Sequence, residues 1–145
     1  MNRGMNFMQI DSKVLIDSNV LVYAVELTSP NHNRAKAVLI EYCDAGACVV
    51  SAQNLAEFMF VVNRKNRATF ESANQFVSNL AENAIVVTYT EKDVLRANQI
   101  CYSYNVPFFD ALLVATMERE KIFTIITENV KDFKKIDWLE VINPF

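Results

Sequence analysis

The sequence predicts an α/β protein, a three-layer α/β/α sandwich built on a mainly parallel sheet of four or five strands. Two observations support this fold class. Short apolar runs of the kind that form buried strands alternate along the chain with longer segments whose apolar residues recur at helical spacing. The strand-like runs are apolar at consecutive positions, which is typical of parallel strands that helices cover on both faces.

The length and composition indicate how many domains to expect. The chain has 145 residues, of which 52% are hydrophobic, enough for one well-buried core and too few for two ordinary domains. It holds only 2 glycines and 3 prolines, and it shows neither a linker-like stretch nor a repeat of fixed period. We therefore expect a single domain over residues 1–145.

The first elements follow from the apolar pattern. Residues 14–16 are predicted to form a buried strand that turns into a helix ending near residue 25, which places Asp17 at the carboxyl end of the strand. A second helix is expected over residues 31–44, where apolar residues share one face. The β-rich run over residues 48–50 then predicts the second strand.

Two helices with recognisable caps come next. Ser51 is a good N-cap for a helix over about residues 52–63, although Asn54 stands where a capping box has Glu or Gln. This places Glu57 in the second turn of that helix. Thr69 is a similar cap for the following helix, whose apolar face consists of Ala73, Phe76, Val77 and Leu80.

The last part of the chain continues the alternation. A third strand and a long helix are followed by a helix that Pro107 opens and that runs to about Lys121. A fourth strand, a short helical turn and an edge strand complete the fold. The third strand is expected at residues 85–87 and the long helix at 91–104. The fourth strand is expected at residues 124–126, the helical turn at 132–135 and the edge strand at 139–142.

Three isolated acids are the most informative feature of the sequence. Each is the only charged residue of an apolar run: Asp17 in residues 14–25, Glu57 in residues 55–62 and Asp110 in residues 106–117. The residues after Glu57 are apolar on every side of a helix, so we expect that helix to be largely buried. In parallel sheets, ligand sites form outside the carboxyl ends of the strands, which is where this pattern places Asp17.

Buried carboxylates need a compensating charge, because an unpaired one costs several kcal/mol. None of the three runs contains Lys or Arg, and the one histidine, His32, falls in a predicted loop. A divalent cation is the simplest compensator, and an all-oxygen ligand set favours Mg²⁺ or Mn²⁺ over Zn²⁺. Helix N-termini offer another explanation for Asp17 and Asp110, but Glu57 lies past the first turn of its helix.

Charge and cysteine content give weaker indications. The formal net charge of −3 and the pI near 5.2 are not typical of nucleic-acid-binding proteins, although basic residues gather at Arg64, Lys65 and Arg67. This trio is either an RNA contact or a solvated helix end. The 3 cysteines lack metal-ligand spacing and indicate core thiols of a cytoplasmic protein. Residues 1–9 resemble no export signal, and no membrane association is expected.

Four stretches together resemble the PIN-domain family, and within it the toxin ribonucleases of toxin–antitoxin pairs. They are VLIDSN at 14–19, SAQNLAEF at 51–58, DALLVAT at 110–116 and TENVKDF at 127–133. The resemblance implies a PIN-like fold and a Mg²⁺- or Mn²⁺-dependent endoribonuclease that hydrolyses RNA, with Asp17, Glu57 and Asp110 as metal ligands and catalytic residues. It also implies an antitoxin partner and a homodimer.

The chain departs from the family pattern at the fourth acid, whose place is taken by Asn129, a weaker candidate ligand because its amide oxygen can ligate a metal or orient water but brings no negative charge. Fewer anionic ligands weaken a second cation site, to which Asp132 is a further candidate contributor. Ser18, Asn19 and Thr127 are candidates for orienting the ligating carboxylates, or else ordinary turn residues.

Two other hypotheses remain open at this point. One is a non-catalytic PIN-like module that binds RNA or protein, for which the missing acid and the acidic pI argue. The other is a receiver-like phosphoacceptor domain, which would have paired acids after the first strand, where this chain has Asp17 followed by Ser18.

Overall fold

The computed structural model describes residues 12–145. At its centre is a five-stranded sheet with the strand order β3-β2-β1-β4-β5, and every neighbouring pair is parallel. The expected parallel sheet is therefore confirmed, with the edge strand included. The strands are β1 (Val14–Ile16), β2 (Cys48–Ser51), β3 (Ile85–Val87), β4 (Thr124–Ile126) and β5 (Glu140–Ile142).

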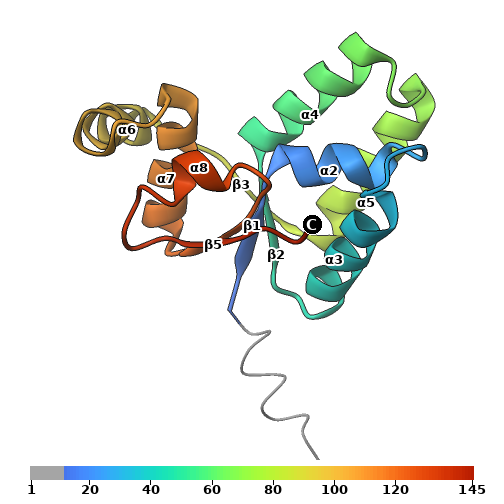
Figure 1. Cartoon of the computed structure of the whole chain (residues 1–145), viewed down its shortest axis with the longest axis horizontal. Coiled ribbons are helices and arrows are strands. Elements are labelled where there is room, and N and C mark those ends of the chain that lie inside the picture. Colours follow the sequence, from blue (N-terminus) through green and yellow to red (C-terminus); the bar gives the residue numbers. More distant parts are fainter. Residues whose placement is uncertain (1–11) are drawn as a thin grey trace, which may run out of the picture.

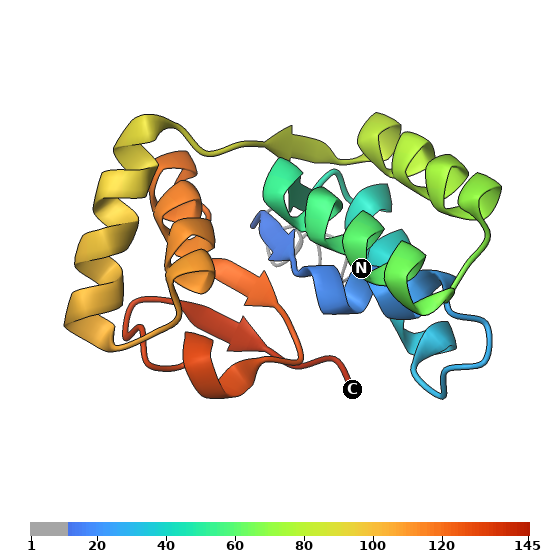
Figure 2. The same ribbon diagram turned by 90° about the horizontal axis from the view of Figure 1, so that it is seen from above.

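Helices cover both faces of this sheet, as the consecutive apolar positions of the strands predict. Figure 1 shows α2 to α5 on one side of the strands and α6 to α8 on the other, and Figure 2 shows the same two groups from above. The helices are α2 (Ser18–Val25), α3 (His32–Asp44), α4 (Ala52–Lys65), α5 (Phe70–Asn83), α6 (Glu91–Tyr104), α7 (Phe108–Glu120) and α8 (Val130–Phe133).

The strands separate two hydrophobic cores. Leu15, Val49 and Ile125 point into the core beneath α6 and α7. Their neighbours Ile16 and Ile126 point to the opposite face, into the core beneath α2 to α5. Each of these side chains is almost fully buried, and burying one contributes about 1.5–3 kcal/mol. The alternation of side chains along short strands thus fixes which residues face which helices.

The strand order brings the carboxyl ends of β1, β2 and β4 together. From β1 the chain proceeds outward through β2 to β3, then returns to the other side of β1 to form β4 and β5. The backbone N–H of Asp17 donates to the carbonyl of Ile126 at 3.0 Å, so the residue after β1 lies beside the end of β4. Such a reversal in an open parallel sheet is where ligands bind.

The burial of α4 is lower than the sequence indicates. Only Asn54, Phe58 and Val62 of this helix are buried, and Phe60 is 63% exposed. The buried residues are spaced four apart and form one stripe, while the apolar residues between them face outward or sideways. The prediction that this helix is largely buried was wrong, and Glu57 is only half-buried.

Element boundaries differ from the expected ones by a few residues. Helix α4 continues to Lys65 because Asn66 adopts a left-handed conformation, with φ of 50°, and ends the helix there. The short helix α8 begins two residues earlier than predicted, and α3 begins one residue later.

The cysteines and the helix lengths complete the comparison with the sequence. Cys43, Cys48 and Cys101 are free thiols, but only Cys48 is buried, so the expectation of three core thiols was wrong for the other two. Within residues 12–145, none of the helices combines the length and apolar character that crossing a membrane requires. The segment over residues 1–9, where no export signal was expected, lies outside the described residues.

Candidate functional site

Asp17 lies at the centre of the site. It follows β1 directly, caps the N-terminus of α2 and is only 7% exposed. One of its carboxylate oxygens, Oδ1, accepts the backbone N–H of Ser18 at 2.7 Å. The helix-cap explanation considered for Asp17 is therefore correct as far as it goes, but this bond uses one oxygen only.

The other oxygen of Asp17 faces the end of β4. The Thr127 hydroxyl donates to Oδ2 at 2.7 Å, while the backbone N–H of Asn129 donates to that same hydroxyl oxygen at 2.9 Å. The Asn19 side-chain amide lies 3.2 Å from the Thr127 hydroxyl and 3.4 Å from Oδ2. Ser18, Asn19 and Thr127, all selected from the sequence, thus contact Asp17.

Asn54 is a member of the site that sequence analysis did not select. Its amide nitrogen lies 3.1 Å from Oδ1 of Asp17 and 3.4 Å from Oε1 of Glu57. The side chain is fully buried, and the hydroxyl of Ser51 donates to its amide oxygen at 2.8 Å. The one sequence signal for Asn54 was the incomplete capping box, in which it stands where Glu or Gln would bind the backbone of the cap.

Glu57 and Asp110 approach Asp17 from two further helices. Glu57 stands in the second turn of α4 and Asp110 in the first turn of α7, at the N-terminal ends of both helices. The side-chain amide of Asn129 donates to Oδ2 of Asp110 at 3.3 Å. Three distant parts of the chain therefore deliver acids to one end of the sheet, as the sequence predicts.

The acids are held in an environment that favours their protonated forms. Burial, followed by the negative charge of Asp17, raises the pKa of Glu57 to about 7. Burial, followed by the charges of Asp17 and Asp132, raises the pKa of Asp110 to about 6. Burial also raises the pKa of Asp17, although the hydrogen bond from Thr127 lowers it in part. Each carboxylate thus lies within the electrostatic influence of another.

Among residues 12–145, no cationic side chain forms an ion pair with these acids. The ion pairs within residues 12–145 all involve other carboxylates, and the groups that contact Asp17, Glu57 and Asp110 there are neutral amides, hydroxyls and backbone N–H groups. Three oxygen-bearing acids without a counter-charge are a donor set that suits a hard divalent cation.

The ligands are not already gathered around one point. Within the described part of the chain, no three His, Cys, Asp or Glu side chains are arranged closely enough to hold a metal ion. Amide groups of Asn54 and Asn129 lie against the acids instead. The three acids offer the oxygen donors that Mg²⁺ or Mn²⁺ prefers, but their arrangement here is not that of an assembled metal site.

Asn129 and Asp132, the two weaker candidates for metal ligands, differ in their surroundings. Asn129 turns its amide nitrogen toward Asp110, so it donates a hydrogen bond where the family's fourth acid would offer a charge. Asp132, on α8, acts on Asp110 through its charge and lies 3.9 Å from the ammonium group of Lys135.

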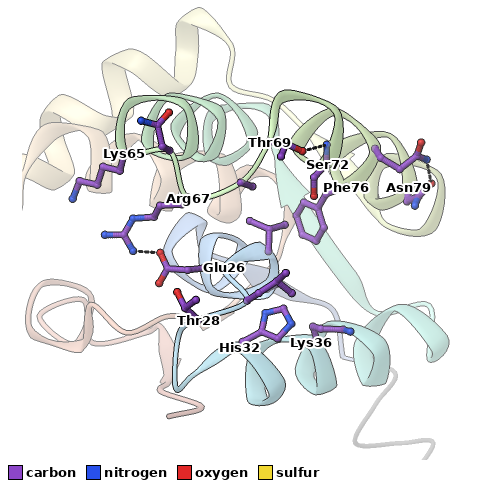
Figure 3. Close-up of a pocket in the computed structure, with 16 residues that line it drawn as sticks. Glu26, Thr28, His32, Lys36, Lys65, Arg67, Thr69, Ser72, Phe76 and Asn79 are labelled. Carbon is purple, nitrogen blue, oxygen red and sulfur yellow. Dashed lines mark hydrogen bonds and ion pairs between the residues drawn. The ribbon is translucent and has the colours of Figure 1, made fainter.

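The basic trio does not form one surface. The guanidinium of Arg64 lies over the exposed ring of Phe60, 5.8 Å from its centroid. Lys65 and Arg67 instead line a cavity of about 990 Å³ between α2, α3, α4 and α5, and Arg67 pairs there with Glu26. Figure 3 shows Lys65 and Arg67 on one side of this cavity, with His32 and Lys36 on the other.

A smaller cavity shares one lining residue, Arg67, with this large cavity. It measures about 190 Å³, and its lining includes Arg67 together with Ser18 and Asn19, two neighbours of Asp17. Arg67 therefore borders both cavities, and it is the member of the trio that lines a cavity together with neighbours of Asp17.

Comparison with solved structures shows the same fold in several proteins. A toxin–antitoxin complex from Klebsiella pneumoniae matches with a TM-score of 0.69 and 20% identity over 92% of this chain and 98% of the other. Mycobacterium tuberculosis VapC20, described as a sarcin–ricin loop cleaving toxin, matches with a TM-score of 0.72 and 18% identity over 90% and 100%. Rickettsia felis VapBC2, bound to a DNA fragment of its promoter, gives 0.65 and 17% over 88% and 96%.

Sequence comparison identifies the family directly. None of the curated protein sequences matches this chain. The family model described as PIN domain, however, matches residues 14–139, a span that begins with β1 and contains Asp17, Glu57 and Asp110. Because this match covers most of the chain, and the five-stranded parallel sheet agrees with it, the chain belongs to the PIN domain family.

Proposed function

We propose that this protein is a metal-dependent endoribonuclease, in which Asp17, Glu57 and Asp110 hold Mg²⁺ or Mn²⁺. The observation that carries the proposal is the convergence of three carboxylates where the parallel sheet reverses its strand order, with no cationic partner among the described residues. Structural polar networks normally pair buried acids with Lys or Arg, whereas an acid cluster that lacks them has the charge to attract a cation.

The residues present suit phosphodiester hydrolysis. Asp17, Glu57 and Asp110 would hold a divalent ion, which would supply an acidified water as nucleophile and positive charge for the leaving oxygen. Thr127 and Ser18 fix the orientation of the Asp17 carboxylate through hydrogen bonds of 2.7 Å each. Because Asn129 takes the place of a fourth acid, we assign one cation to the site. Asp132 has a weaker role, which is to add negative charge near Asp110.

RNA is the proposed substrate on the basis of the family and its structural neighbours. VapC20, which shares the fold, is described as cleaving the sarcin–ricin loop. Arg67, beside the cavity that reaches Ser18 and Asn19, is a candidate to contact an RNA phosphate, with Lys65 further along the same surface. Arg64 is the weakest member of the trio, since its guanidinium stacks on Phe60.

A small antitoxin is the proposed partner. A structural neighbour from Klebsiella pneumoniae is described as a toxin–antitoxin complex. The large cavity between α2, α3, α4 and α5 is a surface such a protein would cover. Its lining combines apolar groups with Lys36, Lys65 and Arg67 against the single acid Glu26, so an acidic segment fits it best. A partner that fills it would also lie against Arg67, which lines the smaller cavity together with Ser18 and Asn19.

The protein is also proposed to act as a cytoplasmic homodimer. Several large apolar side chains, including Phe60, Phe109 and Leu95, are exposed on its helices, and exposed apolar groups often mark association surfaces. Sedimentation equilibrium across a range of protein concentrations tests the dimer. A molecular mass that remains that of one chain at every concentration argues against it.

The proposed activity is tested with purified protein, metal-free and supplemented with Mn²⁺ or Mg²⁺, on structured and single-stranded RNA. We expect cleavage that requires the metal and that Asp17→Asn and Asp110→Asn abolish. The Asp132→Asn variant serves as a matched control, with cleavage reduced but retained. The proposal would be overturned if metal stimulated no cleavage of either kind of RNA and if, on expression in cells, Asp17→Asn affected growth in the same way as the wild type.

The alternative is a non-catalytic module that binds RNA or protein. The replacement of the fourth acid by Asn129 and the acidic pI favour it. Calorimetric titration with Mn²⁺ separates the two functions, because the enzyme requires a Mn²⁺ site that Asp110→Asn removes. RNA binding without such a site would support the module.

A further inference from the structure

The amide of Asn54 is oriented by a chain of hydrogen bonds that runs in one direction. The backbone N–H of Asn54 donates to the hydroxyl oxygen of Ser51 at 2.9 Å, and the proton of that hydroxyl is directed at the Asn54 amide oxygen at 2.8 Å. With its oxygen thus engaged, the amide turns its NH₂ group toward the acids. The orientation follows from donor and acceptor roles at Ser51.

This arrangement exceeds what the helix needs. Ser51 already caps α4 by accepting the Asn54 backbone N–H, so the Asn54 side chain plays no part in satisfying the first turn. In a capping box, the residue at this position reaches back to the backbone of the cap. Here the side chain points instead toward Asp17, the residue that follows β1, and it is 0% exposed. A buried amide costs free energy unless its hydrogen bonds are satisfied. We therefore expect the buried amide of Asn54 to have a role other than capping the helix.

The chemistry of the amide suits two neighbouring carboxylates. An NH₂ group has two hydrogens, and the nitrogen of Asn54 lies within reach of Oδ1 of Asp17 and Oε1 of Glu57. A Lys or Arg here would neutralise the acids and compete with a cation for them. A neutral donor links the two carboxylates and leaves their charge available.

We propose that Asn54 is a positioning residue that keeps the carboxylates of Asp17 and Glu57 beside each other in the metal-free protein, with its own orientation set by Ser51. The inference deepens the proposed function and rests on it, because the two carboxylates serve there as ligands. It assigns to Asn54 an effect on cation affinity that is separate from any effect on folding.

Calorimetric titration of Mn²⁺ into the full-length wild type and three variants tests this role. Asn54→Leu keeps the approximate volume and removes both donors, and we expect the Kd for Mn²⁺ to rise about 10- to 100-fold, as when partners of metal ligands are lost elsewhere. Ser51→Ala leaves the amide and removes the group that orients it, so the Kd should rise about two- to tenfold. Ser29→Ala is the matched control, because Ser29 also accepts a backbone N–H, that of Asn31, but lies in the α2–α3 loop.

Thermal unfolding in EDTA, measured on the same proteins, separates positioning from folding. A purely structural role predicts that Asn54→Leu lowers the unfolding midpoint while its Kd stays within twofold of wild type, and this result overturns the proposal. An equal rise in Kd for Ser29→Ala and Ser51→Ala also overturns it. If Asn54→Leu does not fold, Ser51→Ala against Ser29→Ala decides the question. A wild type that binds no Mn²⁺ overturns the proposed function itself, whereas a wild-type site that both variants leave intact overturns this inference alone.

Discussion

The hydroxyl of Thr127 donates a hydrogen bond of 2.7 Å to the carboxylate of Asp17, although the two residues are 110 positions apart in the sequence. Both are buried, and each follows the last residue of a neighbouring strand, β1 for Asp17 and β4 for Thr127. The contact joins the two halves of the chain at the point where the sheet reverses its strand order, and it makes Thr127 a direct probe of the acidic site.

Replacement of Thr127 by valine should weaken cation binding more than folding. Valine has nearly the same shape and lacks the hydroxyl, so Asp17 loses one donor and its carboxylate is free to turn; we expect about a 10-fold or greater loss of Mn²⁺ affinity. Thr116→Val is the matched control, because Thr116 is also buried and donates its hydroxyl hydrogen bond to the carbonyl of Leu112 within α7. Calorimetry should show an unchanged Kd for the control, and a similar loss in both variants would contradict the prediction.

The metal-free protein should lose stability as the pH rises from about 4 to about 7. The folded state raises the pKa of Glu57 from 4.5 to about 7 and that of Asp110 from 3.8 to about 6. In this window the folded protein therefore binds more protons than the unfolded chain, and the free energy of unfolding falls with increasing pH. Urea unfolding in EDTA at a series of pH values measures the slope.

Glu57→Gln should flatten this pH dependence, since the amide has no proton to release. Glu118→Gln is its control, because Glu118 is a helical acid whose carboxylate pairs with Arg96 away from the site. If the slope for Glu57→Gln equals that of the wild type, the ionisation of Glu57 does not couple to folding.

Mn²⁺ should reverse the loss of stability at neutral pH. A cation that binds the folded state alone stabilises it by about 2.7 kcal/mol when its free concentration is 100 times Kd. Differential scanning calorimetry at pH 7.5, with Mn²⁺ and then with excess EDTA, should show a midpoint that rises and returns. An equal rise in Asp110→Asn would mean that the ion binds elsewhere.

The two phenylalanines of α4 should differ sharply in their effect on stability. Phe58 is fully buried and packs against Phe76 with 5.1 Å between ring centroids, so Phe58→Ala should cost about 3–5 kcal/mol. Phe60 is 63% exposed, and Phe60→Ala should change stability by about 0.5 kcal/mol or less. Chemical denaturation of both variants measures the difference, and comparable losses would mean that Phe60 is covered in solution.

Most of the fold was predictable because it depends on local patterns. The strands β1, β3 and β4 and the helix α6 have the predicted bounds, since apolar runs between polar turns specify them directly. The burial of α4 was not predictable in the same way. A run such as Phe58 to Val62 is apolar on all sides, but which side faces the sheet depends on residues far away in the sequence.

The residues of the site were likewise predictable only where the sequence carries a local signal. Asp17, Glu57 and Asp110 stand out in the sequence because each interrupts an apolar run, and the structure places all three at one end of the sheet. Neither Asn54 nor Arg67 interrupts an apolar run, and the sequence marks them only by an incomplete capping box and a basic trio. The orientation of Asn54 depends on Ser51 and on the distant Asp17, and Arg67 is drawn to Glu26, 41 positions away.

The alternation of side chains between the two cores makes the acidic site vulnerable to events far from it. Strand β4 has three residues, and a slip of one position against β1 would exchange Ile125 and Ile126 between the cores and turn Thr127 away from Asp17. An insertion or an oversized side chain in this strand would therefore inactivate the protein while every acid remained in the sequence. Inactive variants of this kind would be missed by any survey that inspects the carboxylates alone.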